Sequence, residues 1–306
     1  MQKDTTVPQG PGRLSYVEIA SSKINGFAAL MQELKKRLTI NGRVPGTYQN
    51  YSRHLAHLSL YYGKNPIELN ADEVIDYLYE LKSSKEVSKS FFNFTVFGMR
   101  AICQMRGLAY ENFQLPVIPH KKRLPVVLNS SEAAALIKAA SKPKKNGLLI
   151  ATMIDCGLRL NEIRNLEVSH IDLERRTLHV HQGKRSKDRV VFLGEHLTSG
   201  LSNYLEYINP EKYLFEGSRA GSSMSAISIS NIIKSAAKTA GIKKEVSAHT
   251  LRHTCATTML EHNVPLPLIQ KALGHSNIQT TMIYLHVANC SGPNRISPVD
   301  VIIGKR

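Results

Sequence analysis

Residues 247–287 read SAHTLRHTCATTMLEHNVPLPLIQKALGHSNIQTTMIYLHV, a stretch of helical composition whose polar side chains are hard to explain as packing. His249 and Arg252 are three residues apart and therefore face the same way on a helix. They offer one titratable group and one permanent cation to a single target, which suits a phosphodiester. His275 follows the dipeptide LG, and Tyr284 stands alone among threonines and aliphatic residues. The pattern favours a functional site in this stretch.

A zinc site is the alternative for these histidines. His253 lies four residues after His249, and Cys255 is near. However, the glutamate of metalloprotease motifs does not follow His249, and the sequence contains no evident second cluster of ligands. We therefore expect no metal ion and no other cofactor. Any one of these histidines taken alone is more often a structural residue.

Upstream, residues 155–173 read DCGLRLNEIRNLEVSHIDL, in which Gly157 is expected to end one helix and Arg159 to begin the next. An arginine at a helix start beside a glycine turn is placed to reach a ligand. Glu162, three residues later, is placed to hold it through a charge-assisted pair. Such a pair is also common on ordinary protein surfaces.

A β-hairpin is predicted for residues 176–194, RTLHVHQGKRSKDRVVFLG. Two runs rich in β-forming residues, TLHVH and RVVFL, flank a polar turn. The turn contains Gly183, Lys184, Arg185, Ser186, Lys187 and Asp188. Its tip is therefore strongly basic.

The first part of the chain reads as a bundle of about four helices. Apolar residues at spacings of three and four predict helices over residues 47–63, 70–82 and 90–107. Thr47 is a candidate cap of the first of these, and Asn70 with Glu73 resembles a capping box. The aromatic side chains have helical spacing, so we expect them to form the core rather than to stack on bases.

These elements predict two domains. We expect a flexible N-terminus at residues 1–15, a helical domain at 16–115, a linker at 116–125, and a mainly helical second domain with one small sheet at 126–306. In the second domain, Asn129 and Glu132 form another cap-like pair at the start of the first helix. The linker region carries three prolines and the basic trio Lys121, Lys122 and Arg123. These cations are either solvated charge or contacts to a DNA duplex that crosses the linker.

The net charge is +16, from 40 lysines and arginines against 24 acidic residues. Residues 1–125 hold 17 basic and 10 acidic side chains, and residues 126–306 hold 23 and 14. An excess in both halves suits a clamp around nucleic acid, although some proteins are simply basic. The four cysteines are far apart, which predicts a reduced protein with free thiols. The N-terminus lacks a signal-peptide pattern, so we expect a cytoplasmic protein. No apolar run is long enough to predict a membrane span.

The sequence resembles the tyrosine recombinase, or phage integrase, family. The resemblance rests on a set of motifs taken in order: GLRLNEI, the lysine hairpin, HTLRH, LGHS and Tyr284. The resemblance covers the whole second domain, and the helical first domain is compatible with it. It is close to Xer-type and integron-type integrases, and RLPVVL, SKDR, TTMIYLHV and SPVD resemble the integron group. The stretch between Tyr213 and Thr250 is too short for the insert typical of integron integrases.

The resemblance implies a C-shaped two-domain clamp, in which residues 16–115 are a SAM-like core-DNA-binding domain. It also implies an active site around the nucleophile Tyr284. The other implied site residues are Arg159, Lys184, His249, Arg252 and His275, with Glu162 in support and DNA contacts from Lys121, Lys122, Arg123, Arg185 and Lys187. Arg185 stands where a glycine commonly follows the lysine, so Lys187 is the alternative to Lys184 as the acid. By this reading the arginines and His275 bind the phosphate and His249 is the base.

The implied function is site-specific DNA recombination through a 3′-phosphotyrosyl intermediate. A type IB topoisomerase-like enzyme and a catalytically inactive DNA-binding accessory protein are the alternatives. The implied partners are double-stranded DNA and further copies of the chain. We expect a monomer or dimer when free and a homo-tetramer on DNA. In the tetramer, apolar residues of the tail would dock on a neighbouring protomer: Val299, Val301, Ile302 and Ile303. Accessory DNA-bending proteins are expected in some reactions. No motif assigns a DNA sequence or separates integration, excision and resolution.

Overall fold

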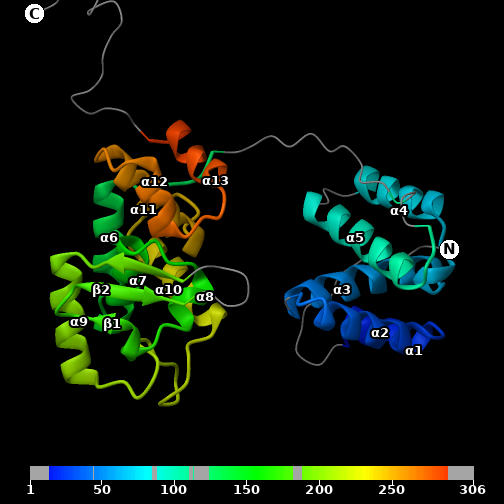
Figure 1. The fold of residues 1–306 in the computed structure, drawn as a ribbon, viewed down its shortest axis with the longest axis horizontal. Helices are drawn as coiled ribbons and strands as arrows, with labels where there is room; N and C mark the ends of the chain where they lie inside the picture. The colour runs from blue at the N-terminus through cyan, green and yellow to red at the C-terminus, as the bar shows by residue number, and fades with distance from the viewer. Residues whose placement is uncertain are drawn as a thin grey trace, which may run out of the picture. The chain divides into compact units, whose positions relative to one another are not determined.

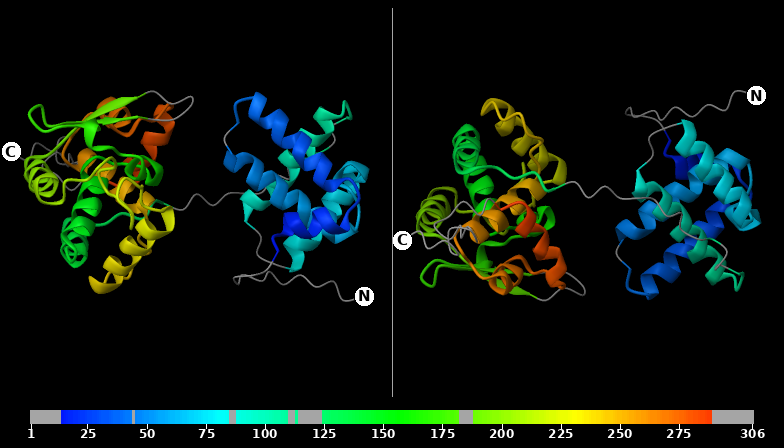
Figure 2. Two further views of the ribbon diagram at one scale, coloured as in Figure 1. Left: turned by 90° about the horizontal axis from the view of Figure 1, so that it is seen from below. Right: turned by 90° about the horizontal axis from the view of Figure 1, so that it is seen from above.

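The computed structural model describes residues 14–43, 45–84, 88–109, 113, 124–181 and 188–288. The chain divides into two compact units, Met1–Lys121 and Lys122–Arg306 (Figures 1 and 2). The prediction of a mainly helical chain with one small sheet is confirmed. Among the described residues, no helix is both long and apolar enough to cross a membrane.

The first unit consists of helices. They are α1 (Tyr16–Lys23), α2 (Phe27–Ile40), α3 (Pro45–Tyr62), the short 3₁₀ helix η1 (Pro66–Glu68), α4 (Ala71–Ser84) and α5 (Lys89–Met105). α3 packs against α1 and α5. Phe27, Tyr77 and Phe92 are buried in the shared core, so these aromatic residues have the packing role that their spacing predicts.

Helix starts in this unit follow simple capping chemistry. The predicted pair at α4 is present, because the Glu73 amide donates to Asn70 Oδ1 (2.8 Å) and the Asn70 amide donates to Glu73 Oε2 (2.9 Å). The predicted cap at Thr47 is wrong. α3 already begins at Pro45, whose missing N–H costs nothing in the first turn of a helix.

The second unit surrounds a three-stranded antiparallel sheet of β1 (Ile171–Asp172), β2 (Thr177–Val180) and β3 (Arg189–Phe192) with helices. The helices are α6 (Ser130–Ala140), α7 (Lys144–Asp155), α8 (Leu160–Arg164), α9 (Glu195–Ile208), α10 (Ala226–Thr239), α11 (Ala248–Glu261), α12 (Leu266–Leu273) and α13 (Ile278–Met282), with 3₁₀ helices η2 (Val168–His170) and η3 (Ile283–His286). Its core includes residues of α6, α7, α9, α10 and the sheet.

The predicted hairpin is formed by β2 and β3, with Leu178 opposite Val191. Side chains alternate along β3, so that Val190 and Phe192 are exposed while Val191 is buried. Arg189 is in phase with Val191 and is only 7% exposed. A buried arginine on the inward face of a strand requires hydrogen-bonding partners, and these partners lead to the candidate site.

Candidate active site

A buried carboxylate organises the site. Glu162 lies in α8, and its side chain is 7% exposed. Arg189 donates to both of its oxygens, at 3.1 Å and 2.8 Å, and Arg159 Nη1 donates to Oε1 at 2.7 Å. Burial by itself raises the pKa of Glu162, but the hydrogen bonds and charge of Arg189, together with Arg159, outweigh this effect and lower the pKa to about 2. Glu162 is therefore ionised and holds two arginines in fixed positions.

The C-terminal end of α12 holds three arginines from three other elements. The carbonyl oxygen of Ala272 accepts from Arg189 Nε (2.7 Å), that of Leu273 from Arg252 Nη2 (2.5 Å), and that of Gly274 from Arg159 Nη2 (3.3 Å). The last carbonyls of a helix have no partner within the helix and carry partial negative charge. They are therefore natural acceptors for guanidinium groups.

Arg159 and Arg252 differ in exposure. The side chain of Arg159 is 39% exposed, whereas that of Arg252 is 5% exposed and also donates to the carbonyl oxygen of Gly157 at 2.6 Å. Burial, helped by the charge of Arg159, lowers the pKa of Arg252 to about 10, so the guanidinium remains charged at neutral pH. Gly157 has a φ of +57°, and a Cβ there would lie 2.6 Å from Leu273 Cδ2. The turn that presents this carbonyl therefore requires glycine.

Tyr284 lies in η3 and is 1% exposed. It belongs to a small apolar cluster with Ala256, Ile269 and Leu273. Burial raises the pKa of its hydroxyl, and the positive charge of Arg252 partly opposes this effect. The hydroxyl is therefore protonated at neutral pH and needs an acceptor for its proton before it attacks an electrophile.

Two histidine rings flank Tyr284. His275, in the turn after α12, is stacked nearly parallel to the tyrosine ring with centroids 6.5 Å apart, and its Nδ1 lies 2.9 Å from Thr281 Oγ1. Burial, followed by the charges of Arg252 and Arg159, lowers the pKa of His275 to about 4. His253 also lies beside the tyrosine, with its Nδ1 3.1 Å from Tyr284 Oη.

His249 lies one helical turn before His253 in α11. It is exposed, and its ring centroid is 6.4 Å from that of His253. The structure thus brings together Arg159, Glu162, Arg252, His275 and Tyr284 from the predicted set, with His249 at the edge. Lys184, Arg185 and Lys187, like Lys121, Lys122 and Arg123, lie outside the described residues.

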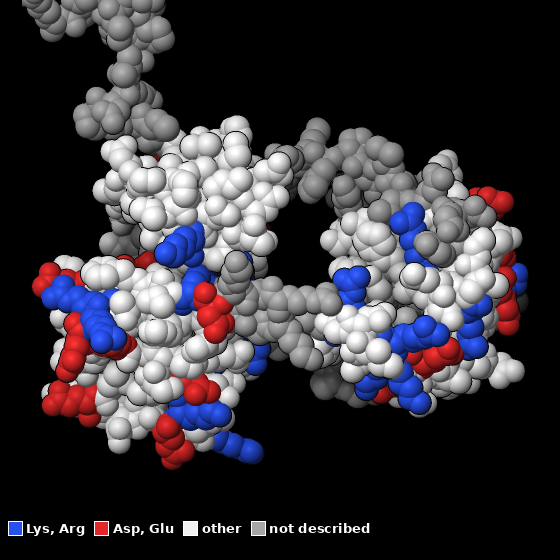
Figure 3. Space-filling model, viewed as in Figure 1, with Lys and Arg blue, Asp and Glu red and all other residues white. Residues whose placement is uncertain are grey.

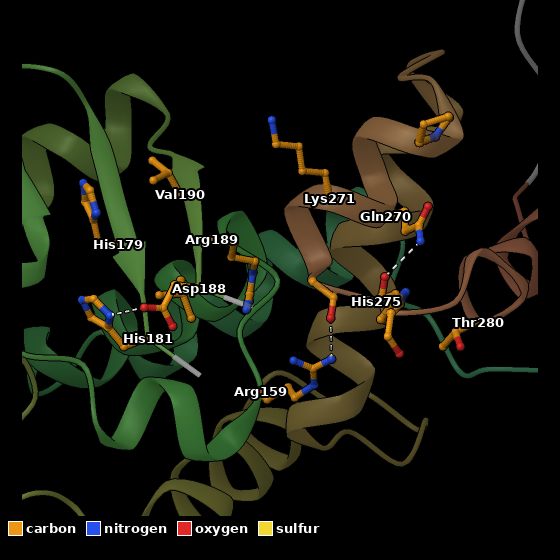
Figure 4. Close-up of a pocket in the computed structure, with 14 residues that line it drawn as sticks. Arg159, His179, His181, Asp188, Arg189, Val190, Gln270, Lys271, His275 and Thr280 are labelled. Carbon is orange, nitrogen blue, oxygen red and sulfur yellow. Dashed lines mark hydrogen bonds and ion pairs between the residues drawn. The ribbon is translucent and has the colours of Figure 1, made fainter. Parts of the chain in front are cut away.

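A pocket of about 1040 Å³ opens beside the arginines (Figure 4). Strands β2 and β3 form one wall with His179, His181 and Val190, while α12 and the turn after it form the other with Lys271 and His275. Arg159 and Arg189 also line it. The pocket therefore lies between the base of the hairpin and the C-terminal end of α12, and its charged lining is mainly basic, with Asp188 as the acidic residue.

Sequence reasoning missed Arg189 and assigned no role to His253 beyond a rejected zinc site. The available signal for Arg189 was its alternation, because a charge in phase with the buried side chains of a strand needs a buried counter-charge. The described residues include no group of three or more histidine, cysteine or acidic side chains arranged to hold a metal ion. Cys255 points instead to the carbonyl oxygen of Asp155, with its Sγ at 3.5 Å.

Comparison with known proteins identifies relatives of the chain. The model of the phage integrase family matches residues 126–290. Tyrosine recombinase XerA of Thermococcus kodakarensis is 31% identical over 264 residues, which cover 84% of this chain and 90% of the relative. Tyrosine recombinase XerD of Staphylococcus aureus is 30% identical over 289 residues, covering 90% and 92%.

Among solved structures, the fold is similar to that of XerH site-specific recombinase bound to difH substrate in a pre-cleavage complex. The TM-score is 0.65 at 23% identity, and the match covers 85% of this chain and 81% of the other.

Proposed function

The chain belongs to the phage integrase family, and from this membership we propose that Tyr284 is the nucleophile that cleaves and rejoins DNA strands in the second unit. The protein is a tyrosine-type site-specific DNA recombinase. Its relatives carry the name tyrosine recombinase, which favours recombination over the topoisomerase-like alternative. The intact set of arginines, histidines and tyrosine argues against an inactive accessory protein.

The observation that carries the proposal is the shared anchoring of the two predicted phosphate-binding arginines. Arg159 and Arg252 donate to the neighbouring carbonyl oxygens of Gly274 and Leu273, in the segment that leads to His275 and Tyr284. A phosphodiester repels nucleophiles, and two fixed guanidinium groups would neutralise its non-bridging oxygens and the charge that develops in the transition state. Because these guanidinium groups are already held in place, little reorganisation is needed on binding.

The proposed reaction is a balanced transfer. The Tyr284 hydroxyl gives its proton to a histidine base as its oxygen forms a bond to phosphorus. The bond from phosphorus to the 5′ oxygen breaks, and that oxygen leaves with a proton from Lys184. His275 adds a hydrogen bond to the phosphate, and His249 faces the same phosphate. The 3′-phosphotyrosyl link conserves the bond energy, and attack by a 5′ hydroxyl reverses the step. This chemistry needs neither ATP nor a metal ion.

The proposed partner is duplex DNA, which both units grip as a C-shaped clamp. Five basic residues would contact its phosphates: Lys121, Lys122, Arg123, Arg185 and Lys187. We further propose a homo-tetramer on DNA, a monomer or dimer when free, and action in the cytoplasm. The bound substrate in the XerH structure supports the DNA partner. The apolar tail that would join protomers, residues 299–303, lies outside the described residues.

A covalent-trapping experiment tests the nucleophile. On a nicked suicide substrate in EDTA, the wild-type protein should form a DNA adduct that survives detergent. Tyr284→Phe should bind the same DNA with similar affinity and form no adduct, because only the hydroxyl is lost. An adduct with Tyr284→Phe, or its loss from wild type in EDTA, would show that the proposed function is wrong.

Substituting sulfur for the 5′ leaving oxygen tests the acid. A thiolate leaves with little protonation, so Lys184→Ala should cleave normal DNA slowly and recover on the sulfur-substituted DNA. Lys187→Ala is the matched control and should behave like wild type on both substrates. The reverse pattern would assign the acid to Lys187.

A further inference from the structure

His253 makes a contact that the proposed reaction has not used. Its Nδ1 lies 3.1 Å from Tyr284 Oη, and the ring centroids are 5.6 Å apart. The ring is partly buried in the middle of α11. Among the described histidines, His253 is the one with a nitrogen in a hydrogen bond to the proposed attacking oxygen.

The electrostatics of the pair set its protonation states before the reaction, with a protonated phenol facing an unprotonated imidazole. Burial raises the pKa of Tyr284, which keeps the phenol protonated until a base removes the proton. Burial also lowers the pKa of His253, and the neighbouring charges of His249 and Arg252 lower it further. The imidazole is therefore neutral at neutral pH. With its own proton on Nε2, it presents a lone pair at Nδ1 to the tyrosine O–H.

We propose that His253 is the base that accepts the Tyr284 hydroxyl proton as the tyrosine oxygen attacks the DNA phosphate. The inference rests on the proposed function of Tyr284. In the forward step the O–H bond breaks, the proton moves to His253 Nδ1, and the oxygen electron pair forms the bond to phosphorus. In the reverse step His253 returns the same proton to the tyrosine as it leaves. Both steps balance without a co-reactant.

The surroundings of His253 separate it from the other two histidines. His249 is exposed on the preceding turn of α11, so it is free to face the phosphate together with Arg252. His275 approaches Tyr284 through ring stacking, and its Nδ1 already contacts Thr281. The base role that the sequence analysis gave to His249 therefore passes to His253, one turn later on the same helix.

The test is single-turnover cleavage of the nicked suicide substrate. His253→Ala removes the acceptor, whereas His253→Asn places an amide oxygen near the position of Nδ1, where it accepts a hydrogen bond but does not take the proton. Both variants should form the adduct about 10²-fold more slowly than wild type, with unchanged DNA affinity. His262→Gln, an exposed histidine at the end of the same helix, is the matched control and should leave the rate unchanged.

A more acidic tyrosine separates a lost base from a lost contact. Difluorotyrosine at position 284 loses its proton more readily, so it should recover much of the rate of His253→Asn and leave the defect of His249→Gln unchanged. A wild-type cleavage rate in His253→Asn would overturn the proposal. So would a result in which difluorotyrosine restores the cleavage rate of His249→Gln but not that of His253→Asn. Thermal unfolding of each variant shows whether it is folded. Failure of the wild-type protein to form any adduct at Tyr284 would instead reject the proposed function.

Discussion

At the scale of single residues, Arg189 determines how firmly Glu162 can hold Arg159. Its side chain is 4% exposed and bonds both carboxylate oxygens and the carbonyl oxygen of Ala272. Arg189→Met removes the cation that bonds both oxygens of the buried carboxylate, which keeps Arg159 as a hydrogen-bond partner and Arg252 at 4.0 Å. Removing one member of a buried ion pair costs about 3–5 kcal/mol, and we expect a loss of that size in the free energy of unfolding, measured by urea denaturation.

Two further variants complete this prediction. Arg189→Lys keeps the charge but not the two-pronged geometry, so its stability should fall between wild type and Arg189→Met. Arg175→Met is the control. The Arg175 side chain is 85% exposed, and its ion pair with Asp172 is long, at 3.8 Å, so its loss should change stability little. A loss in Arg175→Met equal to that in Arg189→Met would contradict the assigned role.

Glu162 gives the stability of the protein a predictable dependence on pH. Its pKa falls from an ordinary value of 4.5 to about 2 on folding. The folded state therefore binds the proton less tightly, so the stabilisation is complete above pH 4.5 and is lost as the pH falls toward 2. The difference corresponds to about 3 kcal/mol. Denaturant unfolding between pH 7 and pH 3 should show a shallower decline for Glu162→Gln, while the exposed Glu174→Gln should follow wild type.

Sequence alone could identify the residues that bear chemistry but not those that hold them. Arg159 and Tyr284 stand out because their types and order match a family pattern. Arg189 does not, since its role depends on a carboxylate 27 positions away that only folding brings near. The contact of His253 with Tyr284 spans 31 positions and depends on how η3 packs against α11.

At the scale of elements, the C-terminal end of α12 is the point where sequence-distant segments meet. Gly274 ends the helix with a φ of +65°, and its carbonyl oxygen binds Arg159. Gly274→Ala should strain this turn, with a stability cost of about 1 kcal/mol, and should also shift the carbonyl that Arg159 needs. We therefore expect slower adduct formation on the suicide substrate along with the lower stability.

The matched control for this prediction is Gly241→Ala. Gly241 follows α10 with a φ of +68°, and a Cβ there would meet nothing within 4 Å. It should lose similar stability in denaturant unfolding and cleave DNA at the wild-type rate. Equal cleavage by both variants would show that the α12 turn has no special role in placing Arg159.

Local signals predicted most elements because their causes are local. Asn129 and Glu132 form the expected reciprocal cap of α6, and the two runs of the hairpin pair as antiparallel strands. Strand β1 was not foreseen, because it has two residues and exists only by pairing with β2. Its conformation is set by the neighbouring strand rather than by its own sequence.

At the scale of the whole molecule, the charge is distributed rather than concentrated. On the face of each unit seen in Figure 3, lysine and arginine side chains are interspersed with acidic ones.

The proposed tetramer depends on the C-terminal tail, which lies outside the described residues. Deleting residues 295–306 should leave DNA binding intact and abolish complexes larger than a protomer pair in gel-shift and light-scattering measurements. Unchanged recombination by the truncated protein would reject the proposed role of the tail.

From the positive excess in both halves we expect DNA affinity to depend on salt and on the presence of both units. Each lysine or arginine that neutralises a phosphate releases a counterion, so affinity falls steeply as salt rises. If about six phosphates are contacted, the affinity should fall roughly 10³-fold between 50 and 200 mM salt. Fluorescence anisotropy with the full chain and with fragments 1–121 and 122–306 measures this directly. Each fragment should bind more weakly and with a shallower salt dependence, because each supplies only part of the contacts. A single fragment with the affinity and salt dependence of the full chain would mean that one unit alone grips the duplex.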